Sequence, residues 1–340
     1  MELYDNNGYL NFAFLKANEQ PFNIIIGGRG IGKTYGKCLD IYEHGEGGSL
    51  LIRTTQKQAD FICSNENTPF KSPLDDVGAL YCVKKLNMYM GGVYKGEIED
   101  DIIKPVKLIC RTAALSTFHN MRGFDGSSIR EIMYDEFNEE DKSTRKRGTG
   151  NSFFNLYETV NRNRELKGED PVKVWLFGNS NDIFNDILVE LQLISKICDM
   201  MRTGKEVSIM KDRGIALYVL QKSPISSKKK NTALYKATAA GSDFQNMALD
   251  NIFKGIDYRN VKKLPLNQLK PVAKCGEIVL YKEKNKQRDY ISLHVSGTPA
   301  ELTQAEFIDK YDRLAFETAF ERGILFESPE AKVLLKRLFT

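Results

Sequence analysis

Residues 22–42 read FNIIIGGRGIGKTYGKCLDIY, an apolar run followed by a glycine-rich turn and an amphipathic segment. Gly27, Gly32, Lys33 and Thr34 fit the spacing G-x-x-x-x-G-K-[ST], which is informative when a strand precedes it and a helix follows. The sequence has both flanks, because 22–26 is typical of a buried strand and 33–44 of a helix. The stretch therefore predicts a phosphate-binding loop inside an α/β domain.

The chemistry expected of this loop follows from its residue types. Glycines allow successive backbone N–H groups to surround a phosphate, and the start of the following helix adds partial positive charge. Lys33 is expected to reach the β- and γ-phosphates of ATP, and the Thr34 hydroxyl to bind Mg²⁺. The competing interpretation is a chance glycine-rich turn. The residues predicted to bind nucleotide are Gly27, Gly28, Arg29, Gly30, Ile31, Gly32, Lys33 and Thr34.

An acidic pair ends a second apolar run, IREIMYDEF at 129–137. We expect this strand beside the loop strand, with Asp135 near the Mg²⁺ and Glu136 orienting or deprotonating the attacking water. The alternative is an ordinary acidic loop, since DEFNEED is acidic almost throughout. A second carboxylate favours hydrolysis over kinase chemistry, because a kinase uses a substrate hydroxyl as its nucleophile.

Strand-like and helix-like segments alternate through the first two-thirds of the chain, which predicts a mostly parallel sheet with helices on both faces. Strands are expected at 22–26, 49–53, 106–110, 129–134 and 172–177, and helices at 33–44, 56–65, 151–164 and 183–197. The segment 80–99 is instead typical of an antiparallel hairpin, with its turn at Gly91-Gly92.

The pattern changes after Cys198. Two more strands are expected in EVSIM and GIALYVL, and the polar, basic stretch SPISSKKKN at 223–231 indicates a domain boundary. We expect a nucleotide-binding domain over 1–225, a small helical linker over 226–256, and a compact α+β domain over 257–340. The last domain is expected to contain strands in EIVLYKE and DYISLHVS, and helices near 304–321 and 328–339.

Several polar residues are candidates for sensing or for contacts between subunits. Asn179 or Ser180 follows the strand VKVWLF and could detect the γ-phosphate, although a simple turn explains them equally well. Arg162, Arg164 and Arg122 are candidates for reaching a neighbouring nucleotide site, or are solvated arginines. Two basic loops suit contacts with DNA phosphates that ignore base sequence, or are simply solvated. Their residues are Lys142, Arg145, Lys146 and Arg147, and Lys228, Lys229 and Lys230.

Composition excludes several classes of protein. The net charge of +4, from 49 basic and 45 acidic residues, is too small to indicate nucleic-acid binding by itself. Six scattered cysteines and three histidines favour neither a zinc site nor a disulfide framework. The N-terminal segment does not resemble a signal peptide, and no apolar run approaches the length of a membrane span. We therefore expect an intracellular protein.

With these motifs in view, the chain resembles the DNA-encapsidation ATPases of small tailed phages with protein-primed linear genomes, distant relatives of the large terminase ATPases. The resemblance rests on GGRGIGKT, IMYDEF, ETVNRNRE and LFGNSND, and then on MALDNIF and AFERGILFESPEAKVLLKRLF. It runs in order from residue 22 to the C-terminus and is weaker over 80–120 and 260–300. The spacing of ETVNRNRE behind DEF, and the C-terminal stretch, are its most specific parts.

The resemblance implies a P-loop NTPase of the ASCE type that forms a ring, expected to be a pentamer, on the portal vertex of a prohead. There it would use ATP and Mg²⁺ to drive double-stranded DNA inward, in the host cytoplasm and away from any membrane; a structural RNA is a further candidate partner. Lys33, Thr34, Asp135 and Glu136 would keep the roles above. Arg162 matches an arginine finger acting on the neighbouring subunit, and Arg122 a second basic residue there. Arg53 and Lys57 are both candidates for the family's lysine after the second strand.

The family's C-terminal domain resembles a vestigial RNase H-like nuclease. The strands EIVLYKE and DYISLHVS show no convincing acidic set, so we expect no DNA cutting and a residual nucleic-acid-binding role. Three alternatives stay open from sequence: a terminase with an active nuclease, another DNA-translocating or helicase-type ATPase, and a nucleotide-binding switch that barely turns over.

Overall fold

The computed structural model describes residues 1–120, 124–138, 148–179, 185–221, 223–238, 245, 259–283, 288–320 and 323–339. The chain divides into two compact units. The first comprises Met1–Ile187 and Met200–Lys254, and the second Leu188–Asp199 and Gly255–Thr340. The predicted SPISSKKKN boundary falls inside the first of these units.

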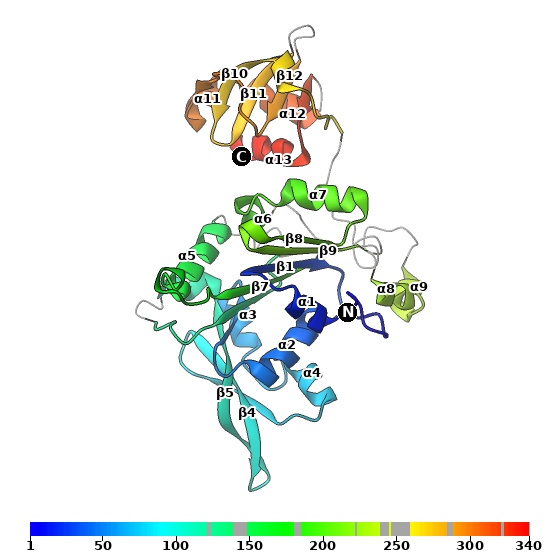
Figure 1. Ribbon diagram of the computed structural model, residues 1–340, viewed down its shortest axis with the longest axis vertical. Helices are drawn as coiled ribbons and strands as arrows, with labels where there is room; N and C mark the ends of the chain where they lie inside the picture. The colour runs from blue at the N-terminus through cyan, green and yellow to red at the C-terminus, as the bar shows by residue number, and fades with distance from the viewer. Residues whose placement is uncertain are drawn as a thin grey trace. The chain divides into compact units, whose positions relative to one another are not determined.

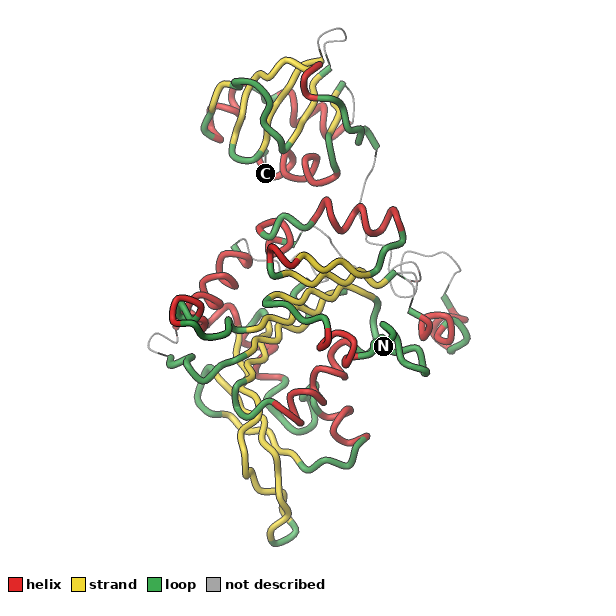
Figure 2. The backbone as a smooth tube through the Cα atoms, viewed as in Figure 1, coloured by secondary structure: helices red, strands yellow, loops and turns green. Residues whose placement is uncertain are grey.

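A large mixed sheet forms the centre of the first unit (Figures 1 and 2). Its strands are β1 Phe22–Gly27, β2 Ser49–Arg53, β3 Tyr81–Lys85, β4 Met90–Glu99, β5 Ile102–Ala114, β6 Glu131–Asp135, β7 Lys173–Gly178, β8 Val207–Met210 and β9 Ile215–Leu220. The nine strands of the described residues are ordered β3-β4-β5-β2-β6-β7-β1-β9-β8. The strands from β5 to β9 in that order run parallel, and antiparallel partners close both edges. The predicted α/β class with a mostly parallel sheet is confirmed.

Helices cover both faces of this sheet. They are α1 Phe12–Ala17, α2 Lys33–His44, α3 Gln56–Phe61, α4 Lys71–Asp76 and α5 Thr149–Asn161. Two short helices, α8 Pro224–Lys229 and α9 Ala233–Ala237, follow the last strand, and α6 Asp186–Glu190 and α7 Ile194–Thr203 lie at the sequence boundary of the two units. Successive strand residues face opposite sides. In β6, Met133 belongs to the core shared with α1, α2 and α4, while Tyr134 stacks on Phe153 of α5 with ring centroids 5.8 Å apart.

The strand order corrects one expectation about the site. The strand that ends in Asp135 does not adjoin the loop strand β1, because β7 pairs with both and lies between them. The carboxyl ends of parallel strands share one edge of a sheet, so Asp135 still reaches the residues that follow β1.

The hairpin prediction is correct for its strands and wrong for its turn. β3 and β4 pair antiparallel, but the connection is at residues 86–89, and both glycines lie inside β4. A side chain at Gly91 would overlap Cys63 Sγ and lie 2.5 Å from Thr112 Oγ1. The glycine therefore allows close packing in a strand interior, where it is otherwise unfavourable. β4 then continues into a second, longer hairpin with β5.

The predicted helix over 183–197 is also wrong in extent. Residues 183 and 184 lie outside the described part, and the described residues form α6 and α7 instead of one helix. Gln192, between these helices, has φ 49°, which interrupts helical geometry.

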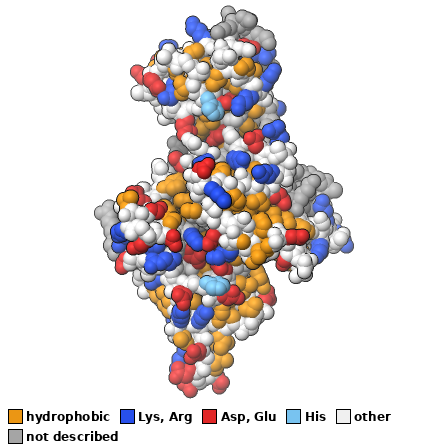
Figure 3. All heavy atoms as spheres, viewed as in Figure 1, with side chains coloured by type: hydrophobic (Ala, Val, Ile, Leu, Met, Phe, Trp, Pro, Cys, Tyr) orange, Lys and Arg blue, Asp and Glu red, His pale blue; other side chains and the backbone are white. Residues whose placement is uncertain are grey.

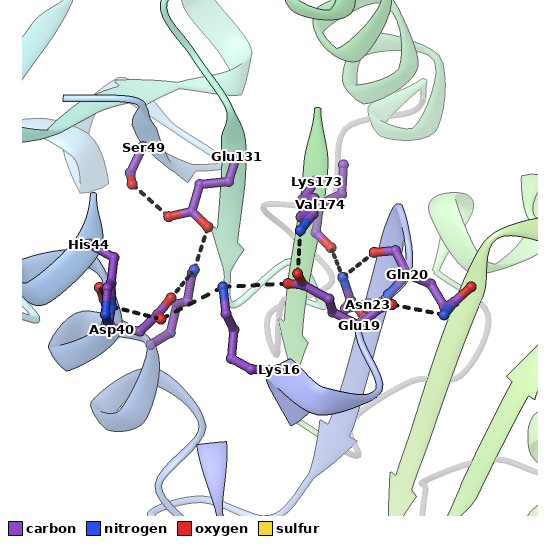
Figure 4. A network of polar contacts seen from close by, with 11 residues as sticks. Lys16, Glu19, Gln20, Asn23, Asp40, His44, Ser49, Glu131, Lys173 and Val174 are labelled. Atoms are coloured by element: carbon purple, nitrogen blue, oxygen red, sulfur yellow. Dashed lines mark hydrogen bonds and ion pairs between the residues drawn. The ribbon is translucent and has the colours of Figure 1, made fainter. Parts of the chain in front are cut away.

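A buried polar network fastens α2 to the edge of the sheet where its parallel strands begin (Figure 4). Lys37 is fully buried, and its Nζ lies 2.5 Å from Glu131 Oε2 and 2.7 Å from Asp40 Oδ2. Ser49 donates to the other oxygen of Glu131 at 2.6 Å. Burial opposes the charge on Lys37, but the two carboxylates outweigh it and raise its pKa. Since Lys37 is one turn after Lys33, this ion pair fixes the helix that begins at the glycine-rich loop.

The second unit is a smaller α+β body. Its strands are β10 Leu269–Cys275, β11 Ile278–Glu283, β12 Asp289–Ser292, β13 Ala300–Glu301 and β14 Ile324–Phe326, and its helices include α11 Gln304–Lys310, α12 Arg313–Phe320 and α13 Pro329–Leu338. The strands form a sheet in the order β13-β10-β11-β12-β14. β10, β11 and β12 are an antiparallel meander, and β14 pairs parallel with β12. Phe307, Leu314 and Leu335 pack the helices against this sheet.

Candidate active site

The glycine-rich loop joins the end of β1 to the start of α2. Gly30 and Gly32 have φ values of 63° and 94°, in the left-handed region that only glycine adopts readily. The carbonyl of Ile31 accepts a hydrogen bond from Leu10 N at 2.8 Å, which anchors the loop to the N-terminal segment. Lys33 is the first residue of α2, so the loop amides and the helix N-terminus converge on one point.

Lys33 is buried within the loop that precedes it. Its Nζ donates to the carbonyls of Gly27 and Gly28 at 2.7 and 2.8 Å, and to Asn179 Oδ1 at 3.1 Å. Three acceptors match the three N–H groups of an ammonium. Burial nevertheless lowers the pKa of Lys33 to about 7, and the Asp135 carboxylate opposes this shift. An anionic ligand in front of the loop would restore the charge.

Thr34 and Asp135 come together across the end of β7. Thr34 Oγ1 donates to Asp135 Oδ1 at 2.9 Å, although 101 residues separate them in sequence. A hydroxyl and a carboxylate oxygen are the kind of ligand that Mg²⁺ takes beside a nucleotide phosphate. The residues present therefore fit a Mg²⁺ ion bound by Thr34 and Asp135, as the sequence predicts.

Arg53, at the end of β2, binds both acidic residues. Its Nη2 lies 3.0 Å from Asp135 Oδ2, and its Nη1 lies 2.6 Å from Glu136 Oε2. Glu136 itself has φ 58°, an uncommon conformation for a non-glycine residue that is typical of functional sites. β2 pairs with β6, and this neighbour relation brings Arg53 to the pair. Sequence left Arg53 and Lys57 as equal candidates, and only Arg53 makes these contacts.

The tip of β7 completes the polar side of the site. Asn179 accepts from Lys33, and its backbone carbonyl accepts from Asn138 Nδ2 at 3.1 Å. Asn138 follows Glu136 by two residues, so the tips of β6 and β7 are directly linked. Ser180, the alternative sensor candidate, lies outside the described residues.

These groups surround a pocket of about 420 Å³. Its lining residues are Arg29, Gly30, Ile31, Gly32, Lys33, Thr34, Tyr35, Asp135, Glu136, Phe177 and Asn179. A pocket of this size suits a small-molecule ligand. Arg29 lines it together with Lys33, so two basic side chains of the loop border the same pocket.

The arginine candidates lie apart from this pocket. Arg162 is exposed at the C-terminal end of α5, where it bonds Asp125 Oδ1 at 3.2 Å and the Phe124 carbonyl at 3.0 Å. Arg164 is buried and donates to the Ser127 carbonyl at 2.7 Å. Of the two, Arg162 is the one exposed at the surface. Arg122 lies outside the described residues.

Of the two basic stretches predicted to contact DNA, the structure describes only residues 228–230. Lys142, Arg145, Lys146 and Arg147 lie outside the described residues. Lys228 and Lys229 are in helix α8, not in a loop, and Lys230 is its C-cap. Lys228 donates to the Asn7 carbonyl at 2.9 Å, and Lys229 donates to the Arg29 carbonyl.

Acidic side chains gather at the tip of the β4–β5 hairpin (Figure 3), which disfavours a DNA contact there.

Comparison with known proteins decides the family. Residues 4–268 match the model of the podovirus DNA encapsidation protein (Gp16). The chain belongs to this DNA encapsidation family. The match takes in the glycine-rich loop, the acidic pair and Arg162, so the chain is a phage DNA-packaging protein of this type, as the sequence resemblance predicts.

Solved structures agree on the fold. The chain is similar to a structure of the bacteriophage Phi-29 viral genome packaging motor assembly, with 16% identity, 99% of each chain covered and a TM-score of 0.63. It is equally similar to the Phi-28 gp11 DNA packaging motor, with 16% identity, 98% of each chain covered and a TM-score of 0.62. A search of curated proteins finds no match. None of the described helices combines the length and apolar character needed to cross a membrane.

Proposed function

We propose that the chain is the ATP-hydrolysing subunit of a ring-shaped motor that drives double-stranded DNA into a preformed prohead. The observation that carries the proposal is the 2.9 Å contact between Thr34 and Asp135, with Lys33 and Glu136 beside it at one edge of the sheet. This arrangement combines a phosphate cradle, a metal site and a candidate base for water. Family membership connects that chemistry to DNA packaging.

The strand order supports a P-loop NTPase of the ASCE type. One strand, β7, separates the loop strand β1 from β6, which carries the acidic pair, and its tip holds the polar Asn179. We propose a domain over residues 1–225 that would bind ATP through Gly27–Thr34. Residues 226–256 would serve as a linker, and residues 257–340 as a separate α+β domain.

The reaction we propose is direct attack of water on the γ-phosphorus of ATP. The oxygen of water bonds to phosphorus as the bond to the β–γ bridging oxygen breaks, and Glu136 accepts the proton that water loses. Lys33 and the loop amides stabilise charge on the phosphate oxygens. Mg²⁺ held by Thr34 and Asp135 would neutralise part of the remaining charge. Before this step, Glu136 has to exchange its bond with Arg53 for one with water.

We further propose that a neighbouring subunit completes the site. Arg162 is exposed and outside the pocket of its own chain, which suits a residue that acts on the next subunit in a ring. A pentamer on the portal vertex, in the host cytoplasm, is the assembly we propose. A structural RNA is a further candidate partner.

We propose that the C-terminal domain is a vestigial RNase H-like nuclease that binds nucleic acid without cutting it. Two of its carboxylates are already engaged: Asp289 pairs with Arg313 at 2.6 Å, and Glu327 accepts from Ser292 at 2.5 Å. Glu327 also lies 2.9 Å from His294 Nδ1. Carboxylates paired in this way are poorly placed to hold two metal ions.

A packaging assay tests the proposed function. Purified chain, proheads, genomic DNA and ATP should yield DNA that resists added nuclease, and omission of ATP should abolish it. Plasmid DNA incubated with the chain and Mn²⁺ should remain intact. Cutting that a C-terminal carboxylate substitution removes would support an active terminase instead. ATP hydrolysis that DNA and proheads leave unchanged would support a switch.

A further inference from the structure

A lysine of helix α8 lies against the glycine-rich loop. Lys229, the last residue of α8, is half-buried, and its Nζ donates to the carbonyl of Arg29, 200 residues away in the sequence. A Cβ atom at Gly30 would lie 2.7 Å from the same Nζ. The ammonium therefore lies directly against the Arg29–Gly30 peptide.

Helix α8 is held in place by the N-terminal segment, which also contacts the loop. Ser223 Oγ donates to the Gly8 carbonyl at 3.1 Å, and Lys228 Nζ donates to the Asn7 carbonyl at 2.9 Å. Leu10 N then donates to the carbonyl of Ile31 at 2.8 Å. Together with the Lys229 bond, these contacts mean that α8, residues 7–10 and the loop each bind the other two.

The Lys229 bond fixes the orientation of one loop amide. A peptide group is planar and trans, so its C=O and N–H point in opposite directions. With the Arg29 carbonyl held by Lys229, the N–H of Gly30 has to face the other way. Arg29 and Gly30 line the nucleotide pocket, whereas Lys229 is not among its described lining residues. The side away from Lys229 is thus the side on which the phosphates are expected.

A second effect comes from charge. The Lys229 ammonium lies against the Arg29–Gly30 peptide, and Arg29 and Lys33 line the pocket beside that peptide. Like charges that share one loop repel each other, and a polyphosphate bound by the loop would relieve the repulsion. The arrangement therefore favours an anionic ligand over no ligand.

We propose that Lys229 is a positioning residue for nucleotide polyphosphate: it holds the Arg29–Gly30 peptide with the Gly30 N–H facing the phosphates. The inference rests on the proposed function, since it assumes that the loop binds nucleotide. It gives one lysine of the basic run at 228–230 a task inside the nucleotide site.

The test compares Lys229→Ala and Lys229→Arg with Lys236→Ala in the full chain. Lys236 is an exposed lysine of α9, so its removal matches the loss of charge. Two readouts are needed: the equilibrium affinity for a fluorescent ADP with Mg²⁺, and the KM and kcat of ATP hydrolysis on DNA-loaded proheads. Thermal melting establishes that each variant is folded.

We expect Lys229→Ala to weaken fluorescent ADP binding and raise KM by about tenfold, the usual effect of one lost charge-assisted bond. kcat at saturating ATP should stay within about twofold, because the bond supports binding and does not act in the chemical step. Lys229→Arg should restore most of the affinity, and Lys236→Ala should match wild type.

Unchanged ADP affinity and KM in Lys229→Ala would overturn the inference, as would an equal loss in Lys236→Ala. Lost DNA affinity with normal nucleotide binding would show instead that Lys229 is a DNA contact. If wild type binds ADP but hydrolyses no ATP on proheads, the proposed function fails, and the binding comparison still tests Lys229.

Discussion

Glu136 is the residue whose contacts bear most directly on control of the reaction. Its carboxylate is bound to Arg53 at 2.6 Å, and its backbone is held at φ 58°. A carboxylate oxygen that accepts from a guanidinium has to release that bond before it can accept a hydrogen bond from water. The structure therefore shows the proposed base in a restrained position.

Removing the guanidinium tests this restraint. In Arg53→Ala we expect hydrolysis without DNA to rise by roughly two- to tenfold, because Glu136 is then free to bind water. Stimulation by DNA and proheads should shrink accordingly. Phosphate release measured with and without DNA and proheads gives the basal rate and the stimulation. Lys57→Ala, which removes an exposed lysine nearby, is the control and should behave as wild type. A fall in both rates of Arg53→Ala would show that Arg53 assists hydrolysis.

The lowered pKa of Lys33 predicts that nucleotide binding takes up a proton, and that this uptake depends on pH. Its pKa is lowered to about 7, so much of it is neutral at pH 8, and bound phosphate should raise that pKa. Binding of ADP with Mg²⁺ at pH 8 should therefore take up a proton, and binding at pH 6 should not, since Lys33 is already charged. Calorimetry in buffers of different ionisation enthalpy measures this. Lys33→Met should abolish the difference, and equal uptake at both pH values would contradict the shift.

At the level of elements, close packing decides what the sequence pattern leaves open. Gly91 lies inside β4, where an added Cβ would overlap Cys63 Sγ. Overpacking a well-filled interior typically costs about 1–3 kcal/mol. Gly91→Ala should lower the free energy of unfolding by that amount, measured by urea denaturation. In the Cys63→Ala background the loss should be smaller. An equal loss in both backgrounds would place the strain elsewhere.

Sequence predicts the parallel strands well because each is a short apolar run. Sequence-based prediction fails where the position of a residue depends on a contact between segments that are distant in the chain. The Gly91-Gly92 pair has the composition of a turn, and only the neighbouring Cys63 and Thr112 explain its place in a strand. Likewise the motif places Lys33, Thr34, Asp135 and Glu136, whereas Arg53 depends on knowing that β2 is next to β6.

Lys229 shows that the contacts of a charged residue are equally hard to predict from sequence. From sequence the run at 228–230 suits contacts with DNA phosphates or is simply solvated, and both interpretations assume an exposed loop. In the structure the run begins in a helix, and one ammonium binds the glycine-rich loop. No local pattern indicates a contact across 200 residues.

For the whole molecule, the proposed ring makes a prediction about mixed subunits. Glu136→Gln and Arg162→Ala should each be inactive when assembled alone, because every site lacks one group. In a mixed ring, a subunit with intact Glu136 can meet a neighbour with intact Arg162, so hydrolysis should partly recover. ATP hydrolysis is measured on DNA-loaded proheads at a fixed total concentration of subunits, while the ratio of the two variants is changed. A mixture as inactive as either variant would show that Arg162 does not act between subunits.

In the proposed motor, Glu136 activates water for the hydrolysis that moves DNA. Single-turnover hydrolysis by Glu136→Gln on DNA-loaded proheads, beside its affinity for ATP, tests it most directly. We predict ATP binding within about threefold of wild type, hydrolysis slower by about a hundredfold or more, and no packaged DNA. Hydrolysis and packaging at the wild-type rate would contradict the account.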